Sequence, residues 1–376
     1  LAERYTVHLG TFVDDQNDWQ YVETVNAYCG ETFFEKLNPT IAKLRSLKGL
    51  ITGRPLSVSY YQHKHFVAWV NHIIAKWPLD GVVVFSSAMA QYVPLKIWDR
   101  IPVIIDFVDV DSDKWRQYAT WKPWPLSAVY AREANRLLAF DRGVAQRASA
   151  SVFVTAQEAN LFRSLAPEVA EKVIPIENGV DADFFDPSKV YDNPYPDDRK
   201  ILLFTGAMDY WANDDAVVWF AENAFPIIKQ FTPNVCFYIV GAKPTERVCS
   251  LVRQQGIHVT GRVDDIRPYL AYADLAVAPL RIGRGMPNKV LEAMAMAKPV
   301  VATSMAVSGL EGVTNDQVVV ADTHMAIAQS VRTLLKTGGE EKGRAARDWV
   351  VNNYSWDRNL HEFGKLIKED SIATAA

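Results

Sequence analysis

The sequence predicts an α/β protein built from two consecutive Rossmann-like units, each a doubly wound parallel sheet. Continuous apolar runs such as residues 81–86 (Gly-Val-Val-Val-Phe-Ser) are typical of strands buried on both faces of such a sheet. These runs alternate with helical patterns, and the alternation restarts after one turn-rich segment, 187–196. Ligands bind beyond the carboxyl ends of the strands in such sheets, so we expect two units that face each other across a ligand cleft.

The first unit is expected to span residues 1–186. Its expected strands are 6–13, 81–86, 102–108, 150–154 and 173–176, and its expected helices are 60–76, 126–147 and 156–165. Residues 22–37 and 39–47 have a weaker helical character. A doubly wound unit begins with a strand, a loop and a helix, whereas this chain opens on a helix end, so we expect the first strand and loop to be missing.

The second unit is expected to span residues 187–353, with 187–196 as the linker. Its expected strands are 200–205, 235–240, 257–260, 275–279, 299–303 and 318–320, and its expected helices are 214–231, 242–255, 266–273 and 289–297. Residues 354–376 form a C-terminal helix, in which Trp356, Leu360, Phe363 and Ile367 recur at helical spacing. This helix either closes the second unit or returns to the first.

Composition excludes several classes of protein. The 376 residues suit two globular domains, with 49% apolar and 22% charged residues. The net charge of -4 gives no electrostatic footprint for nucleic acid. Three scattered cysteines indicate a reduced, cytoplasmic protein, and the chain has neither a signal peptide pattern nor an apolar run that spans a bilayer.

One loop and the helix after it carry the strongest functional signal. Glycines let a backbone approach a ligand, and a helix start beside cations favours an anion. Glu292, one turn into the helix, is placed to accept hydrogen bonds from sugar hydroxyls. The pattern predicts a bound nucleoside diphosphate, and the alternative is a loop that packs a core helix. The glycines and cations of the loop are Arg281, Gly283, Arg284, Gly285 and Lys289.

The second half resembles the nucleotide-binding domain of GT-B glycosyltransferases, in the retaining family four, group 1. The resemblance covers the chain from about Val152 onward. Its motifs, in order, are Ile176-Glu-Asn-Gly-Val-Asp181, Phe204-Thr-Gly-Ala-Met208, Thr260-Gly-Arg-Val-Asp-Asp-Ile-Arg-Pro-Tyr-Leu270, Leu291-Glu-Ala-Met-Ala295 and Ser355-Trp356. Segments 108–115, 208–213 and 285–296 also resemble sugar transferases encoded with exosortase/PEP-CTERM exopolysaccharide systems.

The resemblance implies transfer of a hexose from a UDP- or GDP-sugar to a glycan or lipid-linked acceptor, with retained anomeric configuration. It implies neither a metal ion nor another cofactor, because the diphosphate is held by protein groups and helps to deprotonate the acceptor. The donor-binding residues that it implies are Gly206, Arg262, Val263, Arg281, Gly283, Gly285, Met286, Asn288, Lys289, Val290 and Glu292.

Two departures from the family pattern change the expected chemistry. The family carries paired glutamates eight residues apart across the sugar loop, and here Arg284 stands at the first position and Glu292 at the second. The family histidine near the reacting carbon is replaced by Asp109 or Asp111. The expected catalytic group is therefore Asp109, Asp111, Arg284 and Lys289.

Two clusters of side chains contain residue types that bind metal ions, but we do not predict a metal site at either. Asp109-Val-Asp111 has the Asp-x-Asp pattern of another glycosyltransferase fold, but Asp181-Ala-Asp183 matches it as well. His63, His65 and His72 lie close in sequence, yet no neighbouring carboxylate or cysteine completes the set.

Residues 114–125 mix Trp115, Trp121 and Trp124 with Lys122. Such a belt is typical of a peripheral membrane contact, at the inner face of the membrane for a cytoplasmic enzyme, and it also suits an acceptor groove or plain packing. Two other functions stay open: a nucleotide-sugar epimerase of the same fold, and a non-catalytic sugar-nucleotide binding protein.

Overall fold

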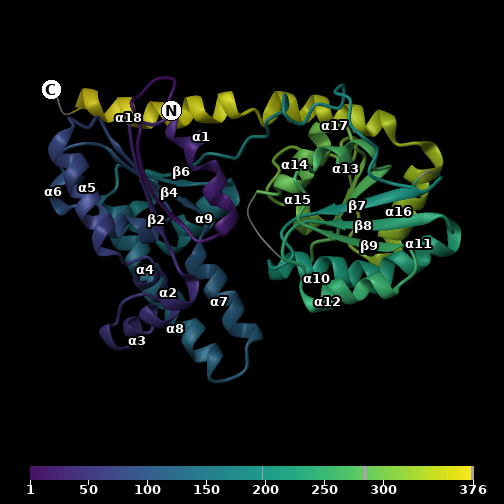
Figure 1. Cartoon of the computed structure of the whole chain (residues 1–376), viewed down its shortest axis with the longest axis horizontal. Coiled ribbons are helices and arrows are strands. Elements are labelled where there is room, and N and C mark those ends of the chain that lie inside the picture. Colours follow the sequence, from purple (N-terminus) through teal and green to yellow (C-terminus); the bar gives the residue numbers. More distant parts are fainter. Residues whose placement is uncertain (197, 283–285, 374–376) are drawn as a thin grey trace. The chain divides into compact units, whose positions relative to one another are not determined.

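The computed structural model describes residues 1–196, 198–282 and 286–373. Contacts divide the chain into two compact units, one formed by Leu1–Ile176 with Leu360–Ala376 and the other by Glu177–Asn359 (Figure 1). Both units contain parallel sheets, as the apolar runs predict.

The first unit holds a four-stranded parallel sheet in the order β3-β4-β5-β6 and a separate parallel pair, β1-β2. Val103, Ile104 and Ile105 of β4 are fully buried because helices cover both faces of the larger sheet. The strands are β1 (His8–Val13), β2 (Glu31–Lys36), β3 (Val82–Phe85), β4 (Val103–Val108), β5 (Ala150–Phe153) and β6 (Val173–Pro175).

Helical character was expected over 22–37, and this prediction is wrong for its second half. Helix α1 ends at Asn26, and β2 pairs with β1. Thr32, Phe33 and Phe34 favour a strand, and Phe33 stacks on Trp69 of α5 with ring centroids 5.7 Å apart. Packing against a helix that is distant in sequence therefore determines that this segment is a strand.

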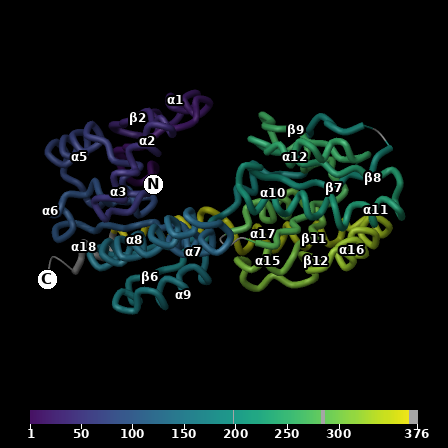
Figure 2. Tube along the Cα trace, turned by 90° about the horizontal axis from the view of Figure 1, so that it is seen from below, coloured from purple at the N-terminus to yellow at the C-terminus, as the bar shows by residue number. Residues whose placement is uncertain are grey.

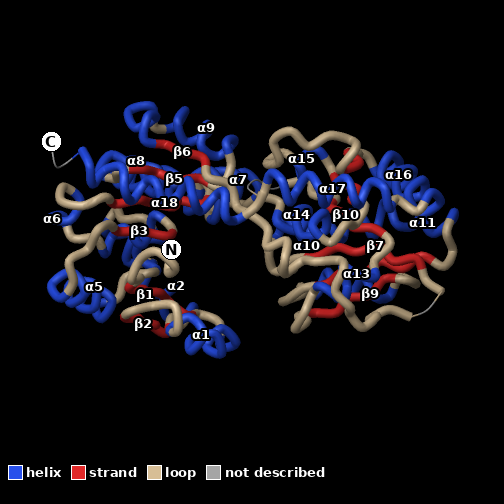
Figure 3. Tube along the Cα trace, turned by 90° about the horizontal axis from the view of Figure 1, so that it is seen from above, coloured by secondary structure: helices blue, strands red, loops and turns tan. Residues whose placement is uncertain are grey.

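Helices cover both faces of the larger sheet of the first unit. Val144 and Phe162 of α8 and α9 pack on one face, and Phe363 and Ile367 of α18 pack on the other (Figure 3). The helices are α1 (Val22–Asn26), α2 (Pro39–Ser46), α3 (Lys48–Thr52), α4 (Leu56–Tyr60), α5 (Lys64–Lys76), α6 (Leu95–Trp98), α7 (Asp111–Trp121), α8 (Leu126–Arg147), α9 (Ala156–Leu165) and α18 (Trp356–Ala373).

Helix α7 was not expected from the sequence. It lies alongside α8 as the first arm of a helical hairpin (Figure 2). Trp115 stacks on Tyr130 with ring centroids 5.0 Å apart, which joins the two arms. This ring serves packing, whereas Trp121 and Trp124, near the turn of the hairpin, are 69% and 82% exposed.

The second unit holds a six-stranded parallel sheet in the order β12-β11-β10-β7-β8-β9. The strand order reverses between β7 and β10, and this is the switch point at which doubly wound sheets bind ligands. The strands are β7 (Lys200–Thr205), β8 (Val235–Val240), β9 (Ile257–Gly261), β10 (Leu275–Ala278), β11 (Val300–Ala302) and β12 (Val318–Val320).

Helices cover both faces of this sheet as well (Figure 1). One face packs against α13, α14, α15 and α17, and the other against α10, α11, α12 and α16. Their bounds are α10 (Trp211–Trp219), α11 (Phe225–Phe231), α12 (Glu246–Ser250), α13 (Arg267–Tyr272), α14 (Asn288–Ala295), α15 (Ser304–Val307), α16 (His324–Thr337) and α17 (Glu340–Asn353).

The turn-rich segment 187–196 packs on the second unit. Tyr195 is buried, and its hydroxyl donates to the carbonyl of Tyr269 at 2.8 Å. The Tyr272 hydroxyl donates to the carbonyl of Tyr191 at 2.7 Å. These bonds hold the segment along α13.

Candidate functional site

The turn after β7 brings backbone and side chains unusually close together. Gly206 has φ +151°, and a Cβ there would lie 2.8 Å from Nδ2 of Asn213 and 3.3 Å from Nζ of Lys289. A Cβ on Gly241, at the end of β8, would lie 1.8 Å from the carbonyl oxygen of Gly206. Only glycines fit at both strand ends, so the site requires this open backbone.

A cavity of about 280 Å³ lies at this switch point. Its walls come from the ends of β7 and β10 and from the starts of α10, α14 and α15, which matches the place where this sheet topology binds ligands. Its lining residues are Thr205, Gly206, Tyr210, Ala212, Asn213, Ile266, Leu280, Ile282, Met286, Pro287, Asn288, Lys289, Glu292, Met305 and Ala306.

Lys289 is the buried cation of this cavity. Its ammonium donates to Oδ1 of Asn213 and lies 4.5 Å from the ring centroid of Phe204. Burial lowers the pKa of Lys289 to about 8, although the carboxylate of Glu292 acts in the opposite direction. Asn213 is held in turn, because its Nδ2 donates to the carbonyl of Ala207 at 2.8 Å. The Lys289 ammonium therefore occupies a fixed and poorly solvated position.

Glu292 lies one turn further along α14 and lines the same cavity. Burial raises the pKa of Glu292 to about 7, against the influence of Lys289. Burial thus favours the neutral form of each side chain, and a ligand that offers polar groups to both side chains favours their charged forms again.

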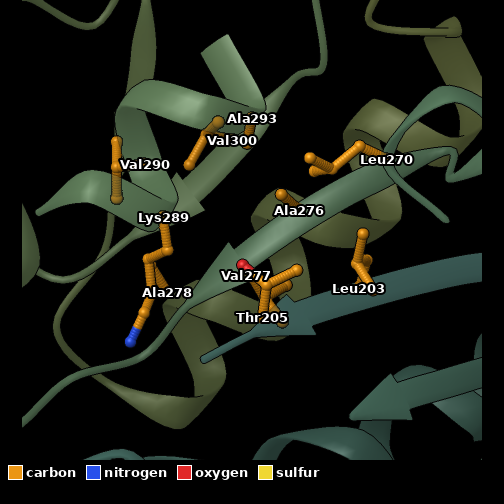
Figure 4. A pocket seen from close by; sticks show the side chains of 10 residues that line it. All are labelled: Leu203, Thr205, Leu270, Ala276, Val277, Ala278, Lys289, Val290, Ala293 and Val300. Carbon is orange, nitrogen blue, oxygen red and sulfur yellow. The ribbon is translucent and has the colours of Figure 1, made fainter. Parts of the chain in front are cut away.

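A second, water-sized cavity of about 10 Å³ lies behind Lys289 (Figure 4). Leu203, Leu270, Ala276 and Val300 are among the apolar residues that line it. Figure 4 shows the Lys289 side chain running beside Ala278, away from this apolar space. The stem of the lysine is therefore packed in the core, and only its end reaches polar partners.

Helix α14 positions both ionisable groups and is fixed at its end by α17. Arg347 donates to the carbonyl of Ala295 and, at 2.8 Å, to that of Phe185. A Cβ on Gly343 would lie 2.0 Å from the carbonyl oxygen of Ala297, so α17 packs directly on the backbone that follows α14. This contact sets the depth at which α14 enters the cavity.

Apart from Arg281, the predicted donor residues fall into four groups. Gly206, Met286, Asn288, Lys289 and Glu292 line the cavity. Val290 is buried in the core, and its N–H donates to the carbonyl of Pro287 at 2.8 Å. Arg262 is exposed and Val263 packs against the core, and neither is among the lining residues. Gly283, Arg284 and Gly285 lie outside the described residues.

Arg281 points to a carboxylate of its own unit. Its Nε and Nη2 donate to the two oxygens of Asp215 at 3.0 and 2.6 Å, and its guanidinium lies 5.4 Å from the Trp219 ring centroid. This two-point contact leaves Arg281 outside the cavity lining. Sequence reasoning missed Asp215, and it also missed Asn213 and Phe204, which contact Lys289.

In the first unit, the end of β4 presents Asp109 from a strained turn. Val108 has φ +66°, a rare conformation for a β-branched residue, and the pairing of β4 with β5 shifts between Asp106 and Val108. Glu158 accepts the N–H of Val110 at 2.7 Å and holds the next residue of the turn. The shift redirects the side chain that follows the strand.

Lys114 binds both predicted catalytic carboxylates. Its Nζ lies 2.7 Å from Oδ2 of Asp109 and 3.2 Å from Oδ1 of Asp111. Burial alone would lower the pKa of Lys114, but the two carboxylates hold it above its usual value. Oδ1 of Asp109 is buried and accepts no hydrogen bond from the part of the chain that the structure describes. Asp109 therefore retains an acceptor position, whereas Asp111 is half exposed.

The expectation that no carboxylate completes the histidine cluster is wrong. Oε2 of Glu35, near the end of β2, lies 3.3 Å from Nδ1 of His63 and 3.8 Å from Nδ1 of His65. These three ligand atoms lie within 4.8 Å of one another. This contact could not be predicted from the sequence, because Glu35 belongs to a strand that was expected to be helical.

The membrane question has one direct observation. Among the described residues, no helix combines the length and the apolar character that crossing a bilayer requires.

The second unit is a doubly wound domain of the Rossmann type with a cavity at the switch point of its sheet. Residues 199–337 match the family described as Glycosyl transferases group 1, which confirms the predicted resemblance of the second half to group 1 glycosyltransferases. No curated protein sequence matches the chain.

Solved structures share the fold over most of the chain. HepE from Anabaena, in complex with UDP and glucose, aligns with a TM-score of 0.67 at 14% identity and covers 98% of this chain and 94% of HepE. A UDP-forming trehalose-phosphate synthase from Burkholderia xenovorans gives 0.64 at 9% identity, with 97% and 99% covered. Sucrose-phosphate synthase from Thermosynechococcus elongatus gives 0.62 at 16% identity, with 82% and 78% covered. The predicted α/β GT-B fold is confirmed.

Because the charge of Lys289 is buried, we predict that this residue lowers the stability of the fold although it serves ligand binding. Lys289→Met is expected to raise the free energy of unfolding at pH 7 by about 1–3 kcal/mol, because it removes a poorly solvated ammonium. The pKa of Lys289 is about 8 in the folded state and near 10.5 when unfolded, so this gain is full below pH 8 and disappears as the pH rises toward 10.5. Chemical denaturation of both proteins across this pH range measures it.

Lys298→Met is the matched control. Lys298 is also buried with a lowered pKa, but it donates to the carbonyls of Ala271 and Ala273, so its replacement should destabilise the fold. Equal destabilisation by Lys289→Met and Lys298→Met would show that Lys289 is an ordinary structural lysine.

Proposed function

We propose that the protein is a retaining glycosyltransferase that moves a sugar from a nucleoside diphosphate sugar to a glycan or lipid-linked acceptor in exopolysaccharide biosynthesis. The observation that supports it most is Lys289, a buried ammonium in a cavity at the sheet switch point of a group 1 glycosyltransferase domain. A UDP-sugar is the first donor to test, because the similar HepE structure contains UDP and glucose.

Lys289 is proposed to bind the diphosphate of the donor. The leaving diphosphate gains negative charge as the bond to the sugar breaks, and a fixed cation in a poorly solvated cavity stabilises that charge strongly. The bound diphosphate adds negative charge beside Lys289, which favours the charged form that burial disfavours. This assignment gives the role of a metal ion to a side chain.

Glu292 is proposed to accept hydrogen bonds from the ribose hydroxyls. It lies one turn along α14 from Lys289 and lines the same cavity, so one nucleotide can contact both side chains. Backbone groups of Gly206, Met286 and Asn288 complete the contacts within the cavity. The proposal also keeps the predicted residues that are not among those lining the cavity. They are Arg262, Val263, Arg281 and Val290, together with Gly283, Arg284 and Gly285, which lie outside the described residues.

Asp109 is proposed to act on the acceptor side. Its buried Oδ1 has an acceptor position to offer to the hydroxyl that attacks the sugar, while Lys114 holds Oδ2 of the same carboxylate in an ion pair. In a retaining reaction of this type the acceptor approaches on the face that the leaving diphosphate vacates, and the diphosphate takes its proton. Asp109 would then orient the hydroxyl, and Asp111 would share Lys114 with it.

The proposed enzyme works at the inner face of a membrane, since lipid-linked acceptors lie there. The exposed rings of Trp121 and Trp124 support a peripheral contact.

The donor site is tested by binding. Lys289→Ala should weaken UDP binding by about 10- to 100-fold, since it removes a charge-assisted hydrogen bond in a buried site. Glu292→Ala should weaken the binding of UDP and leave the affinity for inorganic diphosphate unchanged, because inorganic diphosphate has no ribose. Isothermal calorimetry with UDP, GDP and ADP measures these constants, with the exposed Lys336→Ala and Glu222→Ala as controls. Unchanged affinity in both variants, or no nucleotide bound by the wild type, would refute the site.

The acceptor role is tested by turnover. Asp109→Asn should lower kcat by about 100-fold, as expected for a lost acid–base or orienting group, and should leave the Kd for UDP unchanged. The assay follows UDP release from the preferred donor in the presence of a polyprenyl-diphosphate-linked sugar, with the exposed Asp99→Asn as control. Conversion of the donor to a stereoisomer without acceptor would instead identify an epimerase.

A further inference from the structure

A surface of large aliphatic side chains runs along α2 and α3 of the first unit. We call these residues the α2–α3 surface. They are Ile41, Leu44, Leu47, Leu50 and Ile51, which are 60%, 65%, 50%, 40% and 92% exposed. Scattered exposed aliphatics are ordinary, but five within eleven residues of one helical segment form a contiguous apolar patch, and such patches mark interaction sites.

The opposite face of the same helices consists of small residues. Ala42, Ser46 and Gly49 are buried, and a Cβ on Gly49 would lie 3.0 Å from the carbonyl oxygen of Arg54. Leu47, between the two helices, keeps a helical conformation, so one face continues from α2 into α3. The segment thus packs on the protein through its small side chains and exposes its large ones, which is the reverse of an ordinary surface helix.

The charged residues of the segment that forms this surface are all cations. Residues 36–55 contain five cations and no carboxylate, within a chain whose net charge is -4. Lys36, Lys43, Lys48 and Arg54 are exposed, and Arg45 donates to the carbonyl of Tyr60 at 2.8 Å. Long lysine stems can lie along an apolar layer while their ammonium groups reach anionic headgroups.

The hairpin of α7 and α8 lies beside this surface. Arg132 of α8 donates to the carbonyl of Gly49 at 2.6 Å. Leu126, which is 50% exposed at the start of α8, is six residues earlier and therefore about 9 Å along the helix axis. Figure 1 draws α2, α3 and the turn between α7 and α8 at the same end of the first unit. Aromatic rings beside cations are typical of the membrane interface.

We propose that the α2–α3 surface docks the protein on an anionic phospholipid bilayer. Ile41, Leu44, Leu47 and Ile51 enter the boundary between headgroups and acyl chains, and the surrounding cations bind the phosphates. This deepens the membrane contact of the proposed function, but it rests on residues of the first unit alone. Apolar side chains combined with an unbroken positive charge fit a lipid surface better than a protein partner, which would bring carboxylates to matched positions.

The test is flotation of the full chain with vesicles of phosphatidylcholine, with and without phosphatidylglycerol. The wild type should bind vesicles that contain phosphatidylglycerol, and added salt should weaken this binding. The variant with Ile41→Ser, Leu44→Ser, Leu47→Ser and Ile51→Ser should bind at least about tenfold more weakly, because the removed side chains supply the buried apolar area. Its UDP affinity should stay unchanged, which separates this proposal from failure of the donor site.

Two further variants keep the test decisive. Lys43→Glu with Lys48→Glu should also reduce binding at least about tenfold, since both charges are reversed at the lipid surface. Val190→Ser with Met325→Ser, which replaces exposed aliphatics of the second unit, should bind as the wild type does. The proposal is overturned if the wild type does not bind vesicles that contain phosphatidylglycerol, or if the serine variant binds them as well as the wild type does. A wild-type dimer that the serine substitutions turn into a monomer would assign the surface to a second copy and overturn it as well.

Discussion

A buried ammonium group that makes no ion pair with a carboxylate among the described residues is the constraint on which the second unit depends. Lys289 is held by the side-chain oxygen of Asn213 and by the ring of Phe204, and burial lowers its pKa to about 8. The space for it exists because Gly206 has no side chain, and its depth is set by the contact between α17 and the end of α14. Charge desolvated in this way favours an anionic ligand.

Much of the fold could be predicted from the sequence, because strands buried on both faces appear as continuous apolar runs. Helix α8 matches its expected bounds, and β7 and β8 do as well. Strand β2 was missed because its six residues are stabilised by β1 and by the rings of α5, and neither contact is visible in local periodicity. The exposed aliphatic face of α2 was missed for a related reason, since a helical pattern does not say which face turns inward.

The cavity lies where the sequence placed a ligand, after β10 and at the start of α14. Lys289 and Glu292 stood out because a loop with glycines and cations leads into a helix start, a pattern typical of an anion site. Their partners did not stand out, because Asn213 is 76 residues away from Lys289 and Asp215 is 66 residues away from Arg281. Such contacts depend on strand order, which brings β7 beside β10.

Proton uptake on nucleotide binding tests the central claim most directly. Calorimetry of UDP binding at pH 8, in two buffers of different ionisation enthalpy, counts the protons that the complex gains. The pKa of Lys289 is about 8 in the protein without ligand, so this side chain is about half protonated at pH 8. If a diphosphate binds to Lys289, it favours the protonated form, so binding should take up about half a proton in the wild type and none in Lys289→Met. Binding without proton uptake, or equal uptake in both proteins, would contradict this account of the site.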